Sequence, residues 1–478
     1  MIRNISIFSA VCIFMIICAL PLFAAGNTIY LATSGSDANA GTQDAPVQTF
    51  TKALSLVSAG DTIVVQPGTY TQRFVINKSG SQGSPITIKA NGAVIIDGQN
   101  TRDRLIEVPS GTQHIAIEGF EVKNSANFGV LLSGQYITAD RLTVHHTPGM
   151  GIQTDGQHIT VKGSTVYQTA RSNEARQMGS QWGSGIKCRV GGSDILYEGN
   201  TVYNNYGEGI AVTRCSDVRV VNNRVYDNYS VNIYVDNSYD VTVEKNFMTC
   251  SANSGFEKLD GTRPSGITIG EEYYDGWGAK LARVTIKNNL VGFCSRGVMY
   301  FGSDVSGGGL DNVTIANNTF WGTTDTTISL AHEPTKTRNT TVRNNIAQQP
   351  EGKVAFIENP AGITMSHNFW VRATAPEDWR NATGTGDKFG DVQLATTPSY
   401  TPTSYRLSST SPAIGGGLVL SAVTDDYEGK SRSGSNDMGA IQFSGTGAAS
   451  PTPTPSPSPS IVPTPSLSPS LTPTPSPS

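Results

Sequence analysis

DILYEGNTVYNNYGEGIAV (residues 194–212) and DVRVVNNRVYDNYSVNIYV (residues 217–235) repeat one pattern within a short stretch of the chain. Each has short β-branched runs with alternating polarity, broken by asparagine and glycine where the chain must turn. Related units include HITVKGSTVYQT at 158–169 and NVTIANNTFWG at 312–322. A unit this short cannot bury its own apolar face, so we expect the units to stack into a solenoid.

One asparagine recurs at the same position of these units. On stacked coils such asparagines would lie about 4.8 Å apart, the interstrand spacing, and each amide could bond to the next. The sequence therefore predicts an all-β solenoid of stacked coils. A β-sandwich with coincidental spacing is the alternative. The recurring residues are Asn200, Asn223, Asn246, Asn289, Asn318, Asn345 and Asn368.

The two ends of the sequence differ in composition from the repeats. Residues 1–25 carry one early cation, an apolar run and then small residues, which is typical of a secretory signal; an uncleaved membrane anchor is the alternative. Residues 444–478 are rich in Pro, Ser and Thr and predict a disordered spacer. We expect residues 26–443 to form the β-helix domain of a secreted or cell-surface monomer, with no membrane span in the mature chain.

Charge and cysteine content narrow the function classes. The formal net charge is −4, which offers no electrostatic footprint for nucleic acid. Beyond the signal, four cysteines remain, and they could be buried thiols or disulfides in an oxidising compartment. No CxxC pair indicates a metal site. The four residues are Cys188, Cys215, Cys250 and Cys294.

Four segments carry a resemblance to a known superfamily. They are residues 29–70, 79–98, 411–417 and 436–443. These segments resemble the N-terminal cap, early coils and closing segment of right-handed parallel β-helices of the pectate-lyase-like superfamily. The resemblance implies a single-stranded right-handed parallel β-helix of about 10–12 coils with an N-terminal cap. That fold hosts lyases, hydrolases, epimerases and non-catalytic surface proteins, so the function has to be argued from a site.

One strand of each coil has outward positions that gather charged and polar side chains. Residues i and i+2 of a strand share a face, and neighbouring coils would bring these side chains within roughly 5–15 Å of each other. We call this set the charged face: Gln153, Asp155, Lys187, Arg189, Glu208, Arg214, Tyr234 and Asp236. The residues predicted to face inward from the same strands are Val130, Ile152, Ile186, Ile210, Ile233, Ile267, Val298 and Ile328.

Three insertions emerge beside the charged face, at 171–184, 251–265 and 271–280. Loops that interrupt a regular scaffold tend to carry function. Their aromatic rings suit the apolar faces of sugars, although each ring could instead pack its own loop. The insertions add these predicted substrate-binding residues: Trp182, Glu271, Tyr273 and Trp277.

SGIKCRVGG (residues 184–192) is similar to the lysine-bearing strand of a calcium-dependent pectate lyase family. The resemblance implies that Lys187 removes a proton from the substrate. Nearby Arg189 and Arg214 would favour the neutral amine and could grip a uronate carboxylate. That family binds calcium through clustered aspartates, and here the acids are dispersed. The metal site is therefore unknown. No cofactor is assigned, and calcium is the cofactor that the resemblance suggests.

The predicted function is cleavage of an acidic polysaccharide by β-elimination, with a polysaccharide or a cell-surface glycan as the partner. Two other functions fit the same residues. Paired carboxylates among Asp155, Glu208, Asp236 and Glu271 could hydrolyse a glycosidic bond. The protein could also be a non-catalytic glycan-binding adhesin or surface protein, with Lys187 a surface lysine paired with Asp155 or Glu208.

Overall fold

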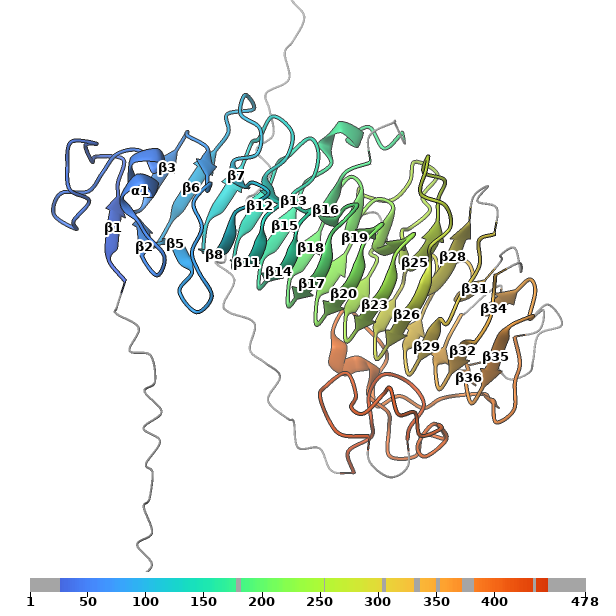
Figure 1. Ribbon diagram of the computed structural model, residues 1–478. Coiled ribbons are helices and arrows are strands. Elements are labelled where there is room, and N and C mark those ends of the chain that lie inside the picture. Colours follow the sequence, from blue (N-terminus) through green and yellow to red (C-terminus); the bar gives the residue numbers. More distant parts are fainter. Residues whose placement is uncertain are drawn as a thin grey trace, which may run out of the picture. The chain divides into compact units, whose positions relative to one another are not determined.

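The computed structural model describes residues 26–177, 182–252, 254–302, 307–330, 336–349, 353–371, 382–432 and 436–445. Within these residues the chain winds into successive coils, and its strands build three parallel sheets (Figure 1). The all-β parallel solenoid predicted from the repeats is thus confirmed. The predicted boundaries at 25 and 443 stay predictions, since 1–25 and 446–478 lie outside the described residues.

The strands of each sheet follow one another along the helix, every pair in parallel register. Sheet A contains β1 (Thr28–Leu31), β2 (Thr62–Val65), β5 (Ile86–Ala90), β8 (Gln113–Glu118), β11 (Gln135–Asp140), β14 (Gln157–Lys162), β17 (Ser193–Glu198), β20 (Ser216–Val221), β23 (Tyr239–Glu244), β26 (Ala282–Lys287), β29 (Thr314–Ala316), β32 (Thr340–Arg343) and β35 (Ile363–Ser366). Sheet B contains β3 (Gly68–Tyr70), β6 (Val94–Asp97), β9 (Glu121–Lys123), β12 (Thr143–His145), β15 (Thr165–Tyr167), β18 (Thr201–Tyr203), β21 (Arg224–Tyr226), β24 (Phe247–Thr249), β27 (Leu290–Gly292), β30 (Thr319–Trp321), β33 (Ile346–Ala347), β36 (Phe369–Trp370) and β37 (Lys388–Phe389). Sheet C contains β4 (Phe74–Val75), β7 (Ile106–Val108), β10 (Val130–Leu132), β13 (Ile152–Thr154), β16 (Ser184–Cys188), β19 (Glu208–Thr213), β22 (Val231–Asp236), β25 (Ser265–Glu271), β28 (Val298–Gly302), β31 (Ile328–Leu330) and β34 (Ala355–Ile357).

The core is a continuous column of aliphatic side chains inside the coils. All eight residues predicted to face inward from sheet C, from Val130 to Ile328, have no exposed surface. Each coil buries only a few such residues, so the apolar area that stabilises the fold is shared between neighbouring coils. The column therefore holds the outward face of every strand in a fixed register.

The predicted asparagine ladder is present at the turn after the sheet A strands. Asn223 donates from Nδ2 to the Asn246 Oδ1 atom at 3.0 Å and to the Tyr197 carbonyl at 2.9 Å. The same pattern continues through Asn289, and the ladder runs to Asn368. Because the amides satisfy buried backbone groups at each turn, the ladder fixes the stacking of the coils.

Two non-repeating segments cover apolar surface that the coils leave open. At the N-terminal end of the column, α1 (Phe50–Leu56) begins at Thr49, whose side chain accepts from the Lys52 N–H. The Phe50 ring stacks on Phe74 at 4.2 Å between centroids. The C-terminal segment 391–443 packs along the outward side of the later strands of sheet B, with the short 3₁₀ turn Pro402–Tyr405 against Phe247 (Figure 1).

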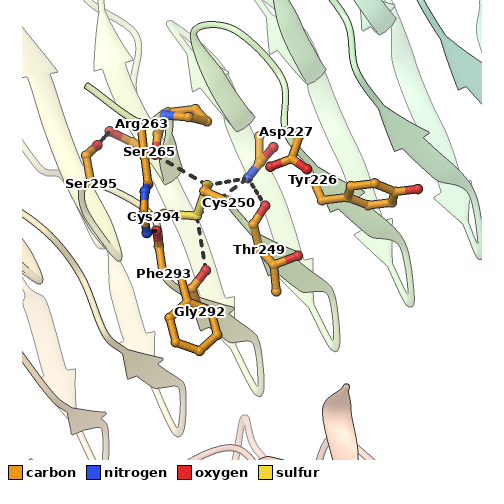
Figure 2. Close-up of a disulfide and its surroundings, with 12 residues drawn as sticks. Tyr226, Asp227, Thr249, Cys250, Arg263, Ser265, Gly292, Phe293, Cys294 and Ser295 are labelled. Atoms are coloured by element: carbon orange, nitrogen blue, oxygen red, sulfur yellow. Dashed lines mark hydrogen bonds between the residues drawn. A yellow bond between two sulfur atoms is a disulfide. The ribbon is translucent and has the colours of Figure 1, made fainter. Parts of the chain in front are cut away.

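Two disulfides cross-link neighbouring coils, which resolves the choice between thiols and bridges. Cys188 bonds to Cys215 beneath sheet C, and Cys250 bonds to Cys294 beside the ends of β24 and β27 (Figure 2). In the part of the chain that the structure describes, the helices are too short to cross a membrane.

Candidate functional site

The outward face of sheet C carries the charged face in one continuous register. Gln153 pairs with Lys187, Lys187 with Ala211, and Ala211 with Tyr234 in adjacent strands. Two residues further along the same strands, and on the same face, Thr213 pairs with Asp236. The structure therefore brings together side chains from the four coils that the repeat alignment predicts.

Lys187 lies on this face with 11% of its side chain exposed. Its Nζ atom contacts Glu208 Oε2 at 3.2 Å, and the Ser184 hydroxyl donates to the same oxygen at 2.5 Å. Glu208 is itself buried. The lysine is thus held in one place by a buried carboxylate, while a small part of its side chain remains exposed.

Gln153 and Asp155 lie in the coil before that of Lys187, and Gln153 is the direct neighbour of Lys187 in sheet C. Gln153 Nε2 donates to Asp155 Oδ2 at 2.7 Å. Burial raises the pKa of Asp155, while this hydrogen bond and the charge of Arg189 act in the opposite direction. Arg189 is half-buried next to this pair, and it makes no ion pair with an acid among the described residues.

Arg214 lies on the other side of Lys187, under the loop of residues 272–280. Its guanidinium carbon sits 4.1 Å from the centre of the Tyr274 ring and 5.9 Å from that of Trp277. Trp277 Nε1 donates to the Asn237 carbonyl at 3.3 Å. The predicted loop aromatics therefore cover a cation of the charged face, an arrangement that stabilises by cation–π attraction.

The Asp236 carboxylate holds the same loop in place by hydrogen bonds. Its carboxylate accepts from the Tyr274 hydroxyl at 2.5 Å, from the Glu272 N–H at 3.0 Å and from Asn237 Nδ2 at 3.0 Å. Burial raises the pKa of Asp236 to about 6. Tyr234 reaches the loop as well, donating to Glu272 Oε1 at 2.8 Å.

Gly270 makes room for the Tyr234 ring on this face. A Cβ atom at that position would lie 2.9 Å from the Tyr234 hydroxyl and 2.9 Å from the Phe301 carbonyl. Any larger residue would push the ring away from its bond to Glu272.

Glu271, predicted to bind substrate from the insertion beside the charged face, is turned away from that face. It has no exposed surface, and its carboxylate accepts from the Leu281 N–H at 2.9 Å, the Gly309 N–H at 2.6 Å and the Tyr300 hydroxyl at 3.1 Å. It follows Gly270 by one step and so turns to the opposite side of the strand. Its contacts make it a support for the loops, not a ligand of substrate.

The other predicted aromatic residues are exposed, Trp182 to 38% and Tyr273 to 69%. The sequence analysis missed Phe301, which is exposed and pairs with Gly270 on the same ladder as Asp236. Glu272 and Asn237 follow the ends of their strands and were not among the predicted site residues. The dense run EEYYDGWGAK was the signal for Glu272, whereas Phe301 follows an ordinary strand.

Several buried polar atoms on this face have no hydrogen-bond partner among the described residues. Such atoms are uncommon in folded proteins and call for a water or a ligand. Sugars, with hydroxyl groups at close intervals, suit a row of donors and acceptors of this kind. The atoms are Gln153 Oε1, Asp155 Oδ1, Thr213 Oγ1, Arg214 Nε and Asn237 Oδ1.

Comparison with known proteins identifies the architecture. A family model for the Pel9A-like right-handed β-helix region matches residues 29–181, and one for right-handed β-helix regions matches residues 106–271. The crystal structure of pectate lyase Pel9A superposes with a TM-score of 0.52 at 19% identity, covering 88% of this chain and 97% of that one. This chain is a right-handed parallel β-helix, and its β-helix resembles those of the pectate-lyase-like superfamily.

The sequence relatives of this β-helix match it over short segments. Pectate lyase PEL9 of Emericella nidulans is 43% identical over 75 residues, 15% of this chain and 18% of that protein. An uncharacterized protein of Bacillus subtilis is 32% identical over 105 residues, 21% of this chain and 22% of that protein. The chain spans between 18% and 29% of the length of the curated relatives it matches.

The calcium that the resemblance implies does not fit the acids of this pectate-lyase-like face. The Asp236 carboxylate is committed to three donors, and burial raises the pKa of both Asp155 and Asp236. Calcium takes about six to eight oxygen ligands, whereas these two acids lie in different coils and their carboxylates already accept hydrogen bonds within the protein. Over the described ranges, no three His, Cys, Asp or Glu side chains are arranged to hold a metal ion.

Proposed function

We propose that this protein is an exported enzyme that cleaves an acidic, uronate-containing polysaccharide by β-elimination on the charged face. The observation that carries the proposal is the position of Lys187 between unpaired polar groups of neighbouring coils, with two arginines nearby that have no acidic partner among the described residues. The pectate lyases among the relatives support the substrate class. Two disulfides support export, because such bonds persist in oxidising compartments.

In the proposed reaction, the neutral Lys187 amine accepts the proton from the carbon next to the uronate carboxylate. Arg189 and Arg214 bind that carboxylate and stabilise the charge that develops on it. The bond between the adjacent ring carbon and the glycosidic oxygen then breaks, leaving a double bond in the sugar, and the released oxygen takes up a proton. Glu208, fixed by Ser184, keeps the lysine side chain directed along the face.

The test is incubation with pectate, alginate and glucuronan, with and without chelator, while ultraviolet absorbance from unsaturated uronate ends is followed. Lys187→Ala should lower the rate by about a hundredfold or more, the range for loss of a general base. Lys162→Ala, an exposed lysine at the end of β14, is the matched control and should retain activity. Unchanged cleavage by Lys187→Ala would refute the assigned base.

Hydrolysis is a second candidate because burial raises the pKa of Asp155, as a general acid needs, and its Oδ1 atom has no hydrogen-bond partner among the described residues. It would release new reducing ends without ultraviolet absorbance, and Asp155→Asn would remove them. Retention on an acidic polymer without any cleavage would instead indicate a glycan-binding protein.

A further inference from the structure

The Cys188–Cys215 disulfide lies directly under the charged face. Cys188 stands between Lys187 and Arg189 in the sequence, and Cys215 follows Arg214. Both cysteines are buried, with 0% and 2% of their surface exposed. One covalent bond therefore ties together the two coil segments that carry the cations of the proposed reaction.

This bond brings the backbones of the two arginines close together. The Cys215 sulfur lies 3.1 Å from the Arg189 carbonyl oxygen, and the Gly191 N–H donates to the Arg214 carbonyl at 3.4 Å. Gly192 is required for the arrangement, since a Cβ atom there would lie 2.6 Å from the Cys188 sulfur. The Cys-Arg-Val-Gly-Gly sequence thus fits both the disulfide and the turn beside it.

Arg189 and Arg214 both lie at the ends of neighbouring strands of sheet C, β16 and β19. Neither makes an ion pair with a described acid, even though most arginines whose contacts the structure gives do so. Arg214 is held against the Tyr274 ring, and its Nε–H has no hydrogen-bond partner among the described residues. A carboxylate bound here would neutralise these charges and accept paired hydrogen bonds from the guanidinium groups.

We propose that Arg189 and Arg214 form a clamp for one uronate carboxylate, and that the Cys188–Cys215 disulfide sets the spacing of its two arms. The identity of the ligand rests on the proposed function. The clamp supplies the fixed positive charge that a bound calcium ion would otherwise supply, since the dispersed acids do not fit calcium. It acts in binding, and the disulfide is a positioning element that does not touch the substrate.

The experiment compares two disulfide deletions in the full chain. Cys188→Ala/Cys215→Ala should weaken binding to the preferred acidic polymer among pectate, alginate and glucuronan by about tenfold, seen as a higher KM and a higher Kd in affinity electrophoresis. Cys250→Ala/Cys294→Ala removes an equally buried bond away from the charged face, and its Kd should stay within about twofold of wild type. Binding to the methyl-esterified polymer should be weak in all three proteins.

A double-mutant cycle tests the clamp with the disulfide intact, in case the cysteine variant does not fold. Arg189→Ala and Arg214→Ala should each weaken binding by about tenfold, and the double variant by less than the product, because both arms bind one carboxylate. Equal losses in both disulfide variants, or independent effects of the two arginines, would overturn the clamp.

The outcomes also separate the clamp from the proposed function. Binding that depends on the disulfide and both arginines, without cleavage, would sustain the clamp and refute the lyase. Cleavage by wild type with unchanged KM in Cys188→Ala/Cys215→Ala would sustain the lyase and refute the clamp. Failure of the wild type to bind any of the three acidic polymers would refute both.

Discussion

At the scale of single residues, burial decides what the acids of the charged face can do. Asp236 has no exposed surface, and three hydrogen bonds only partly offset the cost of burying its charge. Glu208 is nearly as buried but contacts Lys187 Nζ. A buried carboxylate thus serves as a loop anchor in one coil and as the partner of a candidate base in the neighbouring strands.

Asp236 should make stability depend on pH. An unfolded aspartate has a pKa near 3.9, and the folded value is about 6, so only the folded state holds the proton between these values. The free energy of unfolding should therefore fall as pH rises from about 4 to 6, by about 3 kcal/mol from this group. Urea denaturation of wild type and Asp236→Asn at several pH values checks this, because the variant should lack this decline.

Asp217→Asn is the control for this pH series, since Asp217 is exposed at the start of β20. Its curve should run parallel to that of the wild type. If Asp236→Asn also runs parallel, the assigned pKa of Asp236 is wrong.

At the scale of elements, the turns rather than the strands carry the specific polar contacts between coils. Strand pairing alone would allow the coils to shift, because backbone hydrogen bonds look alike at every step. The asparagine ladder removes that freedom, since each amide has a partner only in the correct register. A second, shorter ladder joins Asn205 to Asn228, and the sequence analysis did not predict it.

Asn246→Ala should destabilise the fold by about 3–5 kcal/mol. Asn246 donates to the Val220 carbonyl and Asn289 Oδ1, and it accepts from the N–H and Nδ2 of Asn223, so its loss leaves several buried polar groups unpaired. Thermal and urea unfolding measure the loss. Asn91→Ala, at an exposed turn, should change the free energy of unfolding by less than about 0.5 kcal/mol. A similar loss of stability in both variants would contradict a stabilising role of the ladder.

At the scale of the whole molecule, the C-terminal segment completes a fold that the repeats leave unfinished. The outward side of sheet B turns apolar at Phe247 and Leu290, and the segment covers it with Tyr405, Ala440 and Ile441. Arg432 connects this C-terminal segment to the β-helix by hydrogen bonds. Its buried guanidinium donates to Asn288 Oδ1 and to the Gly439 and Ala440 carbonyls, and burial lowers its pKa to about 10.

Arg432→Met should detach this segment from the β-helix. The change removes the Nη2 donor to Asn288 Oδ1 and one of the donors to each of the Gly439 and Ala440 carbonyls, which we expect to cost about 3–5 kcal/mol. Limited proteolysis should then cleave within 391–443 before the coils unfold. Arg219→Met, which removes an exposed ion pair with Glu244, should cost less than about 1 kcal/mol, and equal protease sensitivity of the two variants would contradict this role.

Much of the charged face could be predicted because a solenoid converts sequence spacing into spatial neighbours. Gln153, Lys187 and Tyr234 occupy the predicted ladder since the side-chain period of a strand is two and the coils stack in register. Glu271 could not be placed by the same reasoning. It lies at the strand end, where a one-residue step reverses the side on which a side chain points.

The sequence by itself determined the coil, the inward column and the asparagine ladder, because these depend on a pattern that recurs within about two dozen residues. Only the tertiary structure decided which cysteines pair, which acid holds Lys187, and that the loop 272–280 stacks its rings on Arg214. These contacts join insertions of unequal length, and no repeat fixes where the tip of an irregular loop comes to rest.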